Sequence, residues 1–267
     1  MFAFTAFLIS FSMSAAMPAR LFAGATIDGL GFLAPFSGLL CLPAEVPPAA
    51  QSEKMYPAGI FDTPSDKVYY LYPWQVDVSQ VPPAPTASSA VDNEDLSVVR
   101  RWQVERTEAQ CVAARAQANA TYDEFFSEVS PFGNPAPVEV ENIFQKVRID
   151  AGSIVGLQKE RYKRPRPFLR DSHITPCLDR ESGYAYPSGH STTARVFGRI
   201  LSELVPAGSG KFMSYADQAA LNRVIGGVHL PLDIEAGKKL GDAIYKALKL
   251  NSAFSADMDT LRRNLKP

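Results

Sequence analysis

The sequence has few of the residues that would define a metal site, a disulfide scaffold or a nucleic-acid surface. It holds three cysteines and three histidines in 267 residues, and its formal net charge is −1. A nucleic-acid-binding protein normally carries a basic excess, so we expect no nucleic-acid partner. Three cysteines exclude a disulfide-dense scaffold, and their spacing matches no metal motif. Beyond about residue 45 no run of roughly 18 apolar residues occurs, so we expect no integral membrane span in the mature chain.

Residues 1–50 are interpreted as a signal or targeting segment. Residues 2–13 form an apolar run, and residues 23–25 fit a small-x-small cleavage site, although the first positive charge, Arg20, follows the run instead of preceding it. We therefore expect a periplasmic or secreted protein. A retained, partly buried N-terminal arm is the alternative. Removal of the segment would leave Cys111 and Cys177, either as a disulfide or as two buried thiols.

The remainder divides into a Pro-rich segment, residues 51–93, and a helical domain, residues 94–267. The first should wrap the surface as loops and short turns. Helical patterning follows Asp92–Asp95, whose side chains suit a helix cap and first turn. No alternation typical of a strand occurs, so we predict an all-α fold, a single helical-bundle domain. The expected helices cover about 96–129 with one break, 138–162, the stretch after Pro187, 214–224, 231 to about 248, and 257–265.

One stretch, residues 183–193, combines a proline, a serine, a glycine and a histidine immediately before a helical pattern. Pro187 suits the first turn of a helix, where its missing N–H costs nothing. Ser188, Gly189 and His190 would then lie at a helix N-terminus, where outward-pointing N–H groups and the helix dipole favour an anion such as phosphate. His190 adds a group that exchanges a proton near neutrality.

Two further segments, each considered alone, could have purely structural roles. Lys159 and Arg166 belong to a basic run that would ordinarily be a solvated helix end. In the second segment Asn222 precedes Arg223, which lies near a predicted helix C-terminus. His229 lies in the following turn, and Asp233 in the next first turn, where each charge would serve a helix dipole.

Taken together, these residues match the needs of phosphate-monoester hydrolysis. Two arginines and a lysine neutralise the non-bridging oxygens. A neutral imidazole can attack phosphorus, while a carboxylate fixes its tautomer. A second histidine can protonate the leaving oxygen. No metal-ligand set is evident, and three cations remove the need for one.

The order Lys159-x6-Arg166-Pro167, Pro187-Ser-Gly-His190, Asn222-Arg223-x5-His229-x3-Asp233 resembles the signature of the phosphatidic-acid-phosphatase-type-2 superfamily. Its soluble members include class A bacterial non-specific acid phosphatases, and vanadium haloperoxidases share the core. The resemblance implies a phosphohistidine on His229, oriented by Asp233, with His190 as general acid and then base. It implies phosphate binding by Lys159, Arg166, Arg223, Ser188 and Gly189, and no cofactor, although vanadate should bind as a phosphate mimic. The family usually has Ser where this chain has Asn222, whose amide can still bind a phosphate oxygen.

We therefore expect a metal-independent acid phosphatase acting on small phosphate monoesters. A vanadate-dependent haloperoxidase is the first alternative, because the same pocket holds vanadate. A non-catalytic protein that binds anions through residues 159–170 is the second. The sequence leaves the physiological ester and the oligomeric state open.

Overall fold

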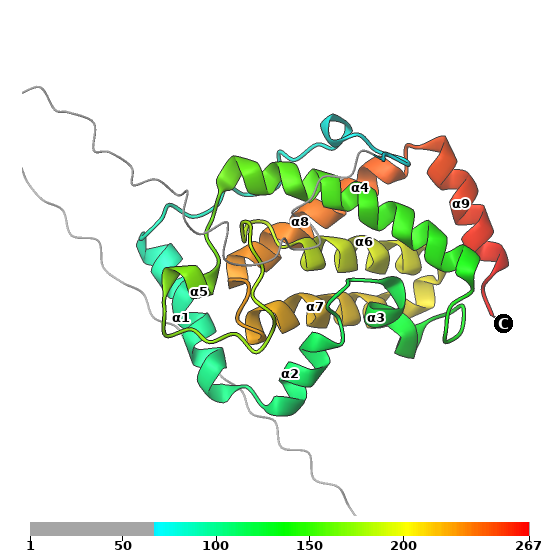
Figure 1. Cartoon of the computed structure of the whole chain (residues 1–267). Coiled ribbons are helices and arrows are strands. Elements are labelled where there is room, and N and C mark those ends of the chain that lie inside the picture. Colours follow the sequence, from blue (N-terminus) through cyan, green and yellow to red (C-terminus); the bar gives the residue numbers. More distant parts are fainter. Residues whose placement is uncertain (1–66, 267) are drawn as a thin grey trace, which may run out of the picture. The chain divides into compact units, whose positions relative to one another are not determined.

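The computed structural model describes residues 67–266, and all regular structure in this range is helical (Figure 1). The all-α prediction is confirmed. The predicted signal segment, residues 1–50, and residues 51–66 of the Pro-rich segment lie outside the described residues. Among the described helices, none is long and apolar enough to cross a membrane. The elements are η2 (Pro73–Gln75), α1 (Ala90–Glu105), α2 (Glu108–Arg115), α3 (Tyr122–Phe126), η3 (Ser127–Val129), α4 (Val138–Tyr162), α5 (Pro167–Arg170), α6 (Gly189–Leu204), η4 (Pro206–Gly208), α7 (Ser209–Ile225), α8 (Pro231–Leu248) and α9 (Ser252–Arg263).

Helix α6 lies at the centre of this bundle. It packs against α7, α8 and α4, and most of its residues are buried (Figure 1). The ring of Phe197 on α6 lies against that of Phe144 on α4, with 4.8 Å between the centroids. Every residue from Ser188 to Ala194 is buried, whereas Arg195 and Arg199 farther along the helix reach solvent. The N-terminus of α6, which carries Ser188 to His190, is therefore fixed inside the fold.

Two glycines allow α8 to lie directly against the first turns of α6. A Cβ added at Gly237 would lie 2.6 Å from the backbone oxygen of Ser188, and one added at Gly241 would lie 2.8 Å from that of Thr192. Real side chains do not approach backbone so closely, so larger residues at these positions would separate the helices. The contact holds the beginning of α8, with Asp233, beside the beginning of α6.

The positions of several helix starts were predicted wrongly. Helix α1 begins at Ala90, before Asp92–Asp95, because the hydroxyl of Ser89 caps it by accepting from Asp92 N at 3.2 Å. Pro187 does not lie in the first turn of α6, since Ser188 is the cap and Gly189 the first helical residue. Between residues 96 and 129 the chain is broken twice, at 106–107 and at 116–121.

Other helix bounds follow the sequence closely. Helix α4 spans Val138–Tyr162 as predicted and ends at Lys163, whose φ of 48° is left-handed. Helix α8 begins at Pro231 as predicted, and Gly226 caps the C-terminus of α7. Helices α7 and α9 each begin about five residues earlier than predicted. In α9 the reason is Asn251, whose side chain accepts from Phe254 N and starts the helix there.

The described part of the Pro-rich segment is fastened to α4. The buried carboxylate of Asp150 accepts hydrogen bonds from the backbone N–H groups of Tyr69, Tyr70 and Leu71 at 2.9, 2.7 and 2.9 Å. Farther along, the hydroxyl of Tyr186 donates to the carbonyl of Pro82. Residues 69–82 thus lie along the helices through these polar contacts and through apolar side chains buried in the main core, such as Leu71, Val76 and Val81, instead of forming a domain of their own.

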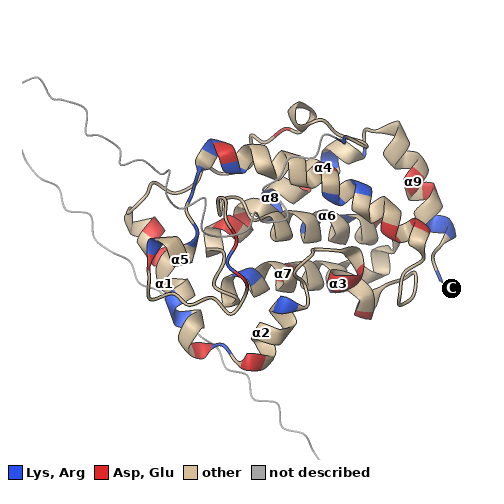
Figure 2. Cartoon of the chain, in the orientation of Figure 1, with Lys and Arg blue, Asp and Glu red and all other residues tan. Residues whose placement is uncertain are grey.

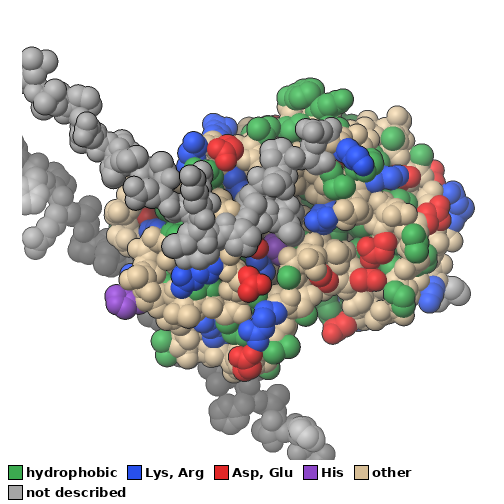
Figure 3. Space-filling view, viewed as in Figure 1, with side chains coloured by type: hydrophobic (Ala, Val, Ile, Leu, Met, Phe, Trp, Pro, Cys, Tyr) green, Lys and Arg blue, Asp and Glu red, His purple; other side chains and the backbone are tan. Residues whose placement is uncertain are grey.

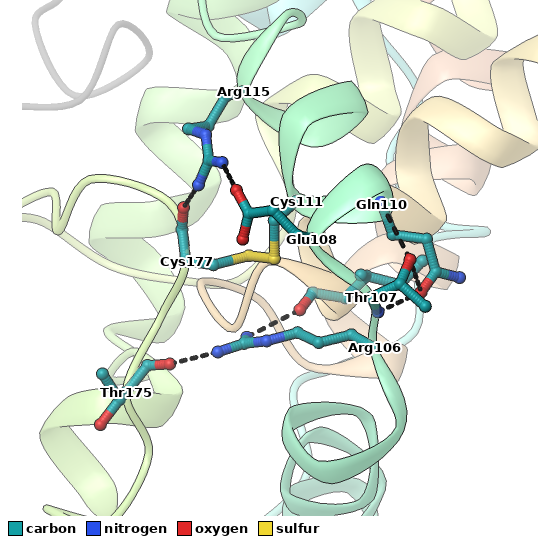
Figure 4. Close-up of a disulfide and its surroundings, with 9 residues drawn as sticks. Arg106, Thr107, Glu108, Gln110, Cys111, Arg115, Thr175 and Cys177 are labelled. Atoms are coloured by element: carbon teal, nitrogen blue, oxygen red, sulfur yellow. Dashed lines mark hydrogen bonds and ion pairs between the residues drawn. A yellow bond between two sulfur atoms is a disulfide. The ribbon is translucent and has the colours of Figure 1, made fainter.

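A disulfide joins Cys111 on α2 to Cys177 in the loop between α5 and α6 (Figure 4). Of the two states that the sequence left open for these cysteines, the structure has the paired one. Around it, Arg115 donates to the carbonyl of Cys177 at 3.0 Å and Arg106 to that of Thr175 at 2.6 Å. The bond closes a sequence separation of 66 residues. In the chain-entropy model such a loop contributes about 4 kcal/mol to stability.

Candidate active site

The charged and imidazole side chains predicted for the site all lie inside the protein. Lys159, Arg166 and Arg223 are 3%, 0% and 2% exposed. The interpretation of the basic run as a solvated helix end is therefore wrong for Lys159 and Arg166, although Arg161 and Lys163 in the same run are exposed. On the face that Figure 3 presents, basic and acidic side chains are interspersed. Buried arginines and lysines call for anionic partners, because an unpaired buried charge is costly.

His229 lies in the turn between α7 and α8 and faces Asp233. Its Nδ1 is 3.4 Å from Oδ2 of Asp233, an oxygen that also accepts from Leu230 N at 2.8 Å. Its Nε2 lies 3.4 Å from Nη1 of Arg166. An arginine can only donate, so this contact requires an unprotonated Nε2 and places the proton on Nδ1, toward the carboxylate. This tautomer leaves the Nε2 lone pair on the side of the cations.

The electrostatic environment keeps His229 neutral. Burial lowers its pKa well below 6.5, and the positive charges of Arg166, Lys159 and Arg223 lower it further. The three cations therefore act on one imidazole, although Lys159, Arg166 and Arg223 come from α4, the segment before α5, and α7. A cluster of three buried cations beside a neutral imidazole is suited to bind an anion.

His190, on the first turn of α6, is held by the turn between α2 and α3. Its Nε2 lies 3.1 Å from the carbonyl of Gln117 and 3.2 Å from that of Ala118. Carbonyls only accept, so Nε2 carries a proton, and in the neutral ring Nδ1 is the basic nitrogen. Burial lowers the pKa of His190 well below 6.5, and Arg223 and His229 add to the effect. Arg223 thus influences both histidines.

Ser188 and Gly189 lie at the start of α6 as predicted, but the serine hydroxyl serves its own helix. It accepts from Ser191 N at 3.4 Å. The backbone N–H of Ser188 donates to the carbonyl of Asp233 at 2.9 Å, which joins the starts of α6 and α8. The phosphate contacts expected for Ser188 and Gly189 stay predictions.

The amide of Asn222 is held by two glutamines. Its Nδ2 donates to Oε1 of Gln117 at 2.9 Å, and its Oδ1 accepts from Gln218 at 2.8 Å. Gln117 is also the residue whose carbonyl holds His190, so Asn222 is linked to His190 through it. The phosphate contact proposed for Asn222 stays a prediction; what the structure adds is a contact with the turn that holds the histidine.

Sequence reasoning missed the cluster behind Asp233, which is centred on Arg164. The guanidinium of Arg164 donates to Asp233 Oδ1 at 2.6 Å, to Asp95 at 2.6 Å and to Asp92 at 2.8 Å. All four side chains are buried. Figure 2 shows the basic segment between α4 and α5 beside the acidic beginning of α1. No local signal distinguishes Asp92 and Asp95 from ordinary first-turn residues, because their partner is about 70 residues away in the sequence.

Glu181, in the loop between α5 and α6, was also missed. Its carboxylate accepts from Nη2 of Arg166 at 2.9 Å and lies 3.6 Å from Nη2 of Arg223. Within residues 67–266 no group of three or more His, Cys, Asp or Glu side chains is arranged to hold a metal ion.

The sequence model of the PAP2 superfamily matches residues 149–250, which contain every residue of the three motifs. This part of the chain belongs to the PAP2 superfamily. The chain is 25% identical over 244 residues to an acid phosphatase of Zymomonas mobilis subsp. mobilis, with 86% of each chain covered. It is also 25% identical over 218 residues to a non-specific acid phosphatase of Providencia stuartii, covering 76% of this chain and 86% of that protein.

A solved structure shares the PAP2 fold of this chain. It is a holo-type bacterial vanadium-dependent chloroperoxidase, with a TM-score of 0.50 and 11% identity. The alignment covers 72% of this chain and 54% of the chloroperoxidase. At this identity the likeness is one of fold.

Arg164 gives a direct test of how Asp233 is held in this PAP2 site. Burial raises the pKa of Asp233, and the Arg164 charge opposes that rise. In Arg164→Gln the pKa of Asp233 should therefore rise further, so that a protonated carboxyl no longer orients His229. We expect kcat to fall about 100-fold and the acid limb of kcat/KM to move to higher pH, measured on a phosphate ester.

Arg170→Gln is the matched control for this variant. Arg170 also pairs with Asp92, at 2.5 Å, but makes no contact with Asp233 among the hydrogen bonds of the described residues. It should retain kcat within about threefold, because the contact of Arg164 with Asp233 stays in place. Equal losses in both variants would mean that the contact with Asp233 has no special role.

Proposed function

We propose that this protein is a metal-independent acid phosphatase that hydrolyses small phosphate monoesters through a phosphohistidine on His229. The observation that carries the proposal is the arrangement around His229, with Asp233 at Nδ1 and the Arg166 guanidinium at Nε2. Arginine is the side chain best shaped to bind phosphate oxygens. The relationship to proteins named acid phosphatases supports the same reaction.

In the first step the lone pair on Nε2 of His229 attacks phosphorus, forming an N–P bond as the bond to the ester oxygen breaks. Asp233 accepts the Nδ1–H and stabilises the positive charge that develops on the ring. Lys159, Arg166 and Arg223 neutralise the three non-bridging oxygens. His190 gives its proton to the departing alkoxide, and because Nε2 of His190 faces two carbonyls, Nδ1 is the atom that transfers it.

In the second step a water molecule attacks the phosphohistidine. Nδ1 of His190, now unprotonated, accepts a proton from that water as its oxygen bonds to phosphorus. The N–P bond breaks, and inorganic phosphate leaves. His229 recovers its neutral form with the proton on Nδ1, and His190 is again protonated, so both histidines are ready for the next substrate.

Release of inorganic phosphate from an aryl phosphate, with and without EDTA, tests this proposal. We expect turnover that EDTA does not reduce, and acid-labile, base-stable incorporation of ³²P into the denatured protein. In His229→Ala the ³²P incorporation should be lost, and kcat should fall about 10⁴-fold because the nucleophile is removed. His173→Ala is the control, because the exposed side chain of this histidine contacts only Asp171 among the hydrogen bonds of the described residues.

A strict requirement for a divalent metal would contradict the proposal. Peroxide-dependent halogenation of a dye by the vanadate-loaded protein, in the absence of phosphatase activity, would favour a haloperoxidase instead.

The acidic pH dependence follows from His190. Its pKa is lowered below 6.5 by burial and by Arg223, and it must be protonated to act as the acid. The protonated form is therefore lost as the pH rises through this lowered pKa, so kcat/KM for an alkyl phosphate should decline on the acid side of 6.5. Substrate phosphate also ionises near pH 6. The pH profile of the residual activity of His190→Ala separates these two ionisations. The decline caused by His190 should be absent from it, whereas the change caused by ionisation of the substrate phosphate should remain.

We also propose that the protein is exported to an oxidising compartment. The Cys111–Cys177 disulfide supports this, since disulfides are rare where glutathione keeps thiols reduced. Fractionation of producing cells should recover the activity outside the cytoplasm, and reduction should lower the free energy of unfolding by about 4 kcal/mol. Active protein found in the cytoplasm with both thiols free would contradict it.

A further inference from the structure

Glu181 occupies an unusual position for a carboxylate in a site proposed to bind phosphate. Its two oxygens face the two arginines that should bind the substrate, with Oε2 2.9 Å from Nη2 of Arg166 and Oε1 3.6 Å from Nη2 of Arg223. A carboxylate has the shape and charge of part of a phosphate group. Glu181 therefore satisfies nitrogen atoms that the mechanism assigns to the substrate.

The cost of burying two arginines explains why an anion is needed there. The pKa of Arg223 is lowered to about 10, because burial and the charge of Arg166 lower it more than Glu181 raises it. Two adjacent guanidinium groups out of water repel each other unless an anion lies between them. Glu181 faces both groups and provides such an anion.

Glu181 differs from its partners in exposure and attachment. Its side chain is 21% exposed, whereas those of Arg166 and Arg223 are 0% and 3% exposed, so the carboxylate approaches from the solvent side. Arg166 also donates to the carbonyl of Val228 at 3.3 Å, and Arg223 belongs to α7. The loop that carries Glu181 has no helix, and it is fixed at Cys177 by the disulfide and at Ala185 by a bond to the carbonyl of Arg164. The two arginines are thus held by contacts that do not depend on Glu181.

We propose that Glu181 is a built-in competitor for phosphate, a carboxylate that the substrate must displace from Arg166 and Arg223. This inference rests on the proposed function, because it assigns the two arginines to phosphate. A phosphate group carries up to two charges and three acceptor oxygens, so it can replace a single carboxylate. A tethered group acts at an effective concentration of the order of millimolar, so Glu181 weakens phosphate binding and sets the substrate concentration that the enzyme needs.

Calorimetric titration with inorganic phosphate tests the proposal without requiring turnover. Glu181→Gln removes the charge at constant shape, and Glu181→Ala removes the whole group. We expect both variants to bind phosphate about fivefold more tightly than the wild type, and KM for an aryl phosphate to fall by a similar factor. Asp179→Asn is the matched control: it removes a negative charge from the same loop at an exposed position and should leave the Kd for phosphate unchanged.

Three results would overturn the proposal. Unchanged or weaker phosphate binding in both Glu181 variants would show that Glu181 only orients the arginines. An equal gain in Asp179→Asn would show a general effect of loop charge. If the wild type bound neither phosphate nor orthovanadate, the phosphate site itself, and with it the proposed function, would be wrong. Thermal melting of each variant ensures that folded proteins are compared.

Discussion

The buried carboxylate of Asp233 is the group on which the rest of the site depends. One of its oxygens accepts from Leu230 N and faces His229, and the other accepts from Arg164. Because both oxygens are engaged in fixed directions, the carboxylate has little freedom to rotate, and the imidazole opposite it has one favoured tautomer. The close approach of α8 to α6 at Gly237 holds the beginning of α8, and so Asp233, next to the N-terminus that carries His190.

Charge balance explains the arrangement of charged side chains around this carboxylate. Arg164 lies between three buried carboxylates, and Arg170 on the outer side adds a second positive charge to Asp92. On the other side of His229 the excess is positive, from Lys159, Arg166 and Arg223, with Glu181 as the acid that faces the two arginines. Buried charges of one sign are expensive without partners. A cluster of buried positive charges is therefore stable only where an anion, internal or bound, balances it.

The two histidines are held by different kinds of contact. His229 is oriented by side chains, whereas His190 is oriented by the backbone carbonyls of Gln117 and Ala118. The turn that supplies these carbonyls follows α2, and the disulfide fastens α2 to the loop that carries Glu181. The turn that holds His190 and the loop that carries Glu181 are thus linked through one disulfide bond.

Helices with strong local signals could be placed from the sequence. Helix α4 was predicted at both ends, because prolines and an apolar stripe define it locally. The imidazoles, cations and Asp233 of the candidate site could be grouped from their chemistry and from the family resemblance of their order. The sequence could not show four features that depend on the folded chain: the partners of Arg164, the pairing of Cys111 with Cys177, the position of Glu181 and the contact of Asn222 with Gln117. These are contacts between segments far apart in the chain, between residues whose types are equally common on a solvated surface. No local pattern records such contacts, because their energy arises only when folding removes both partners from water.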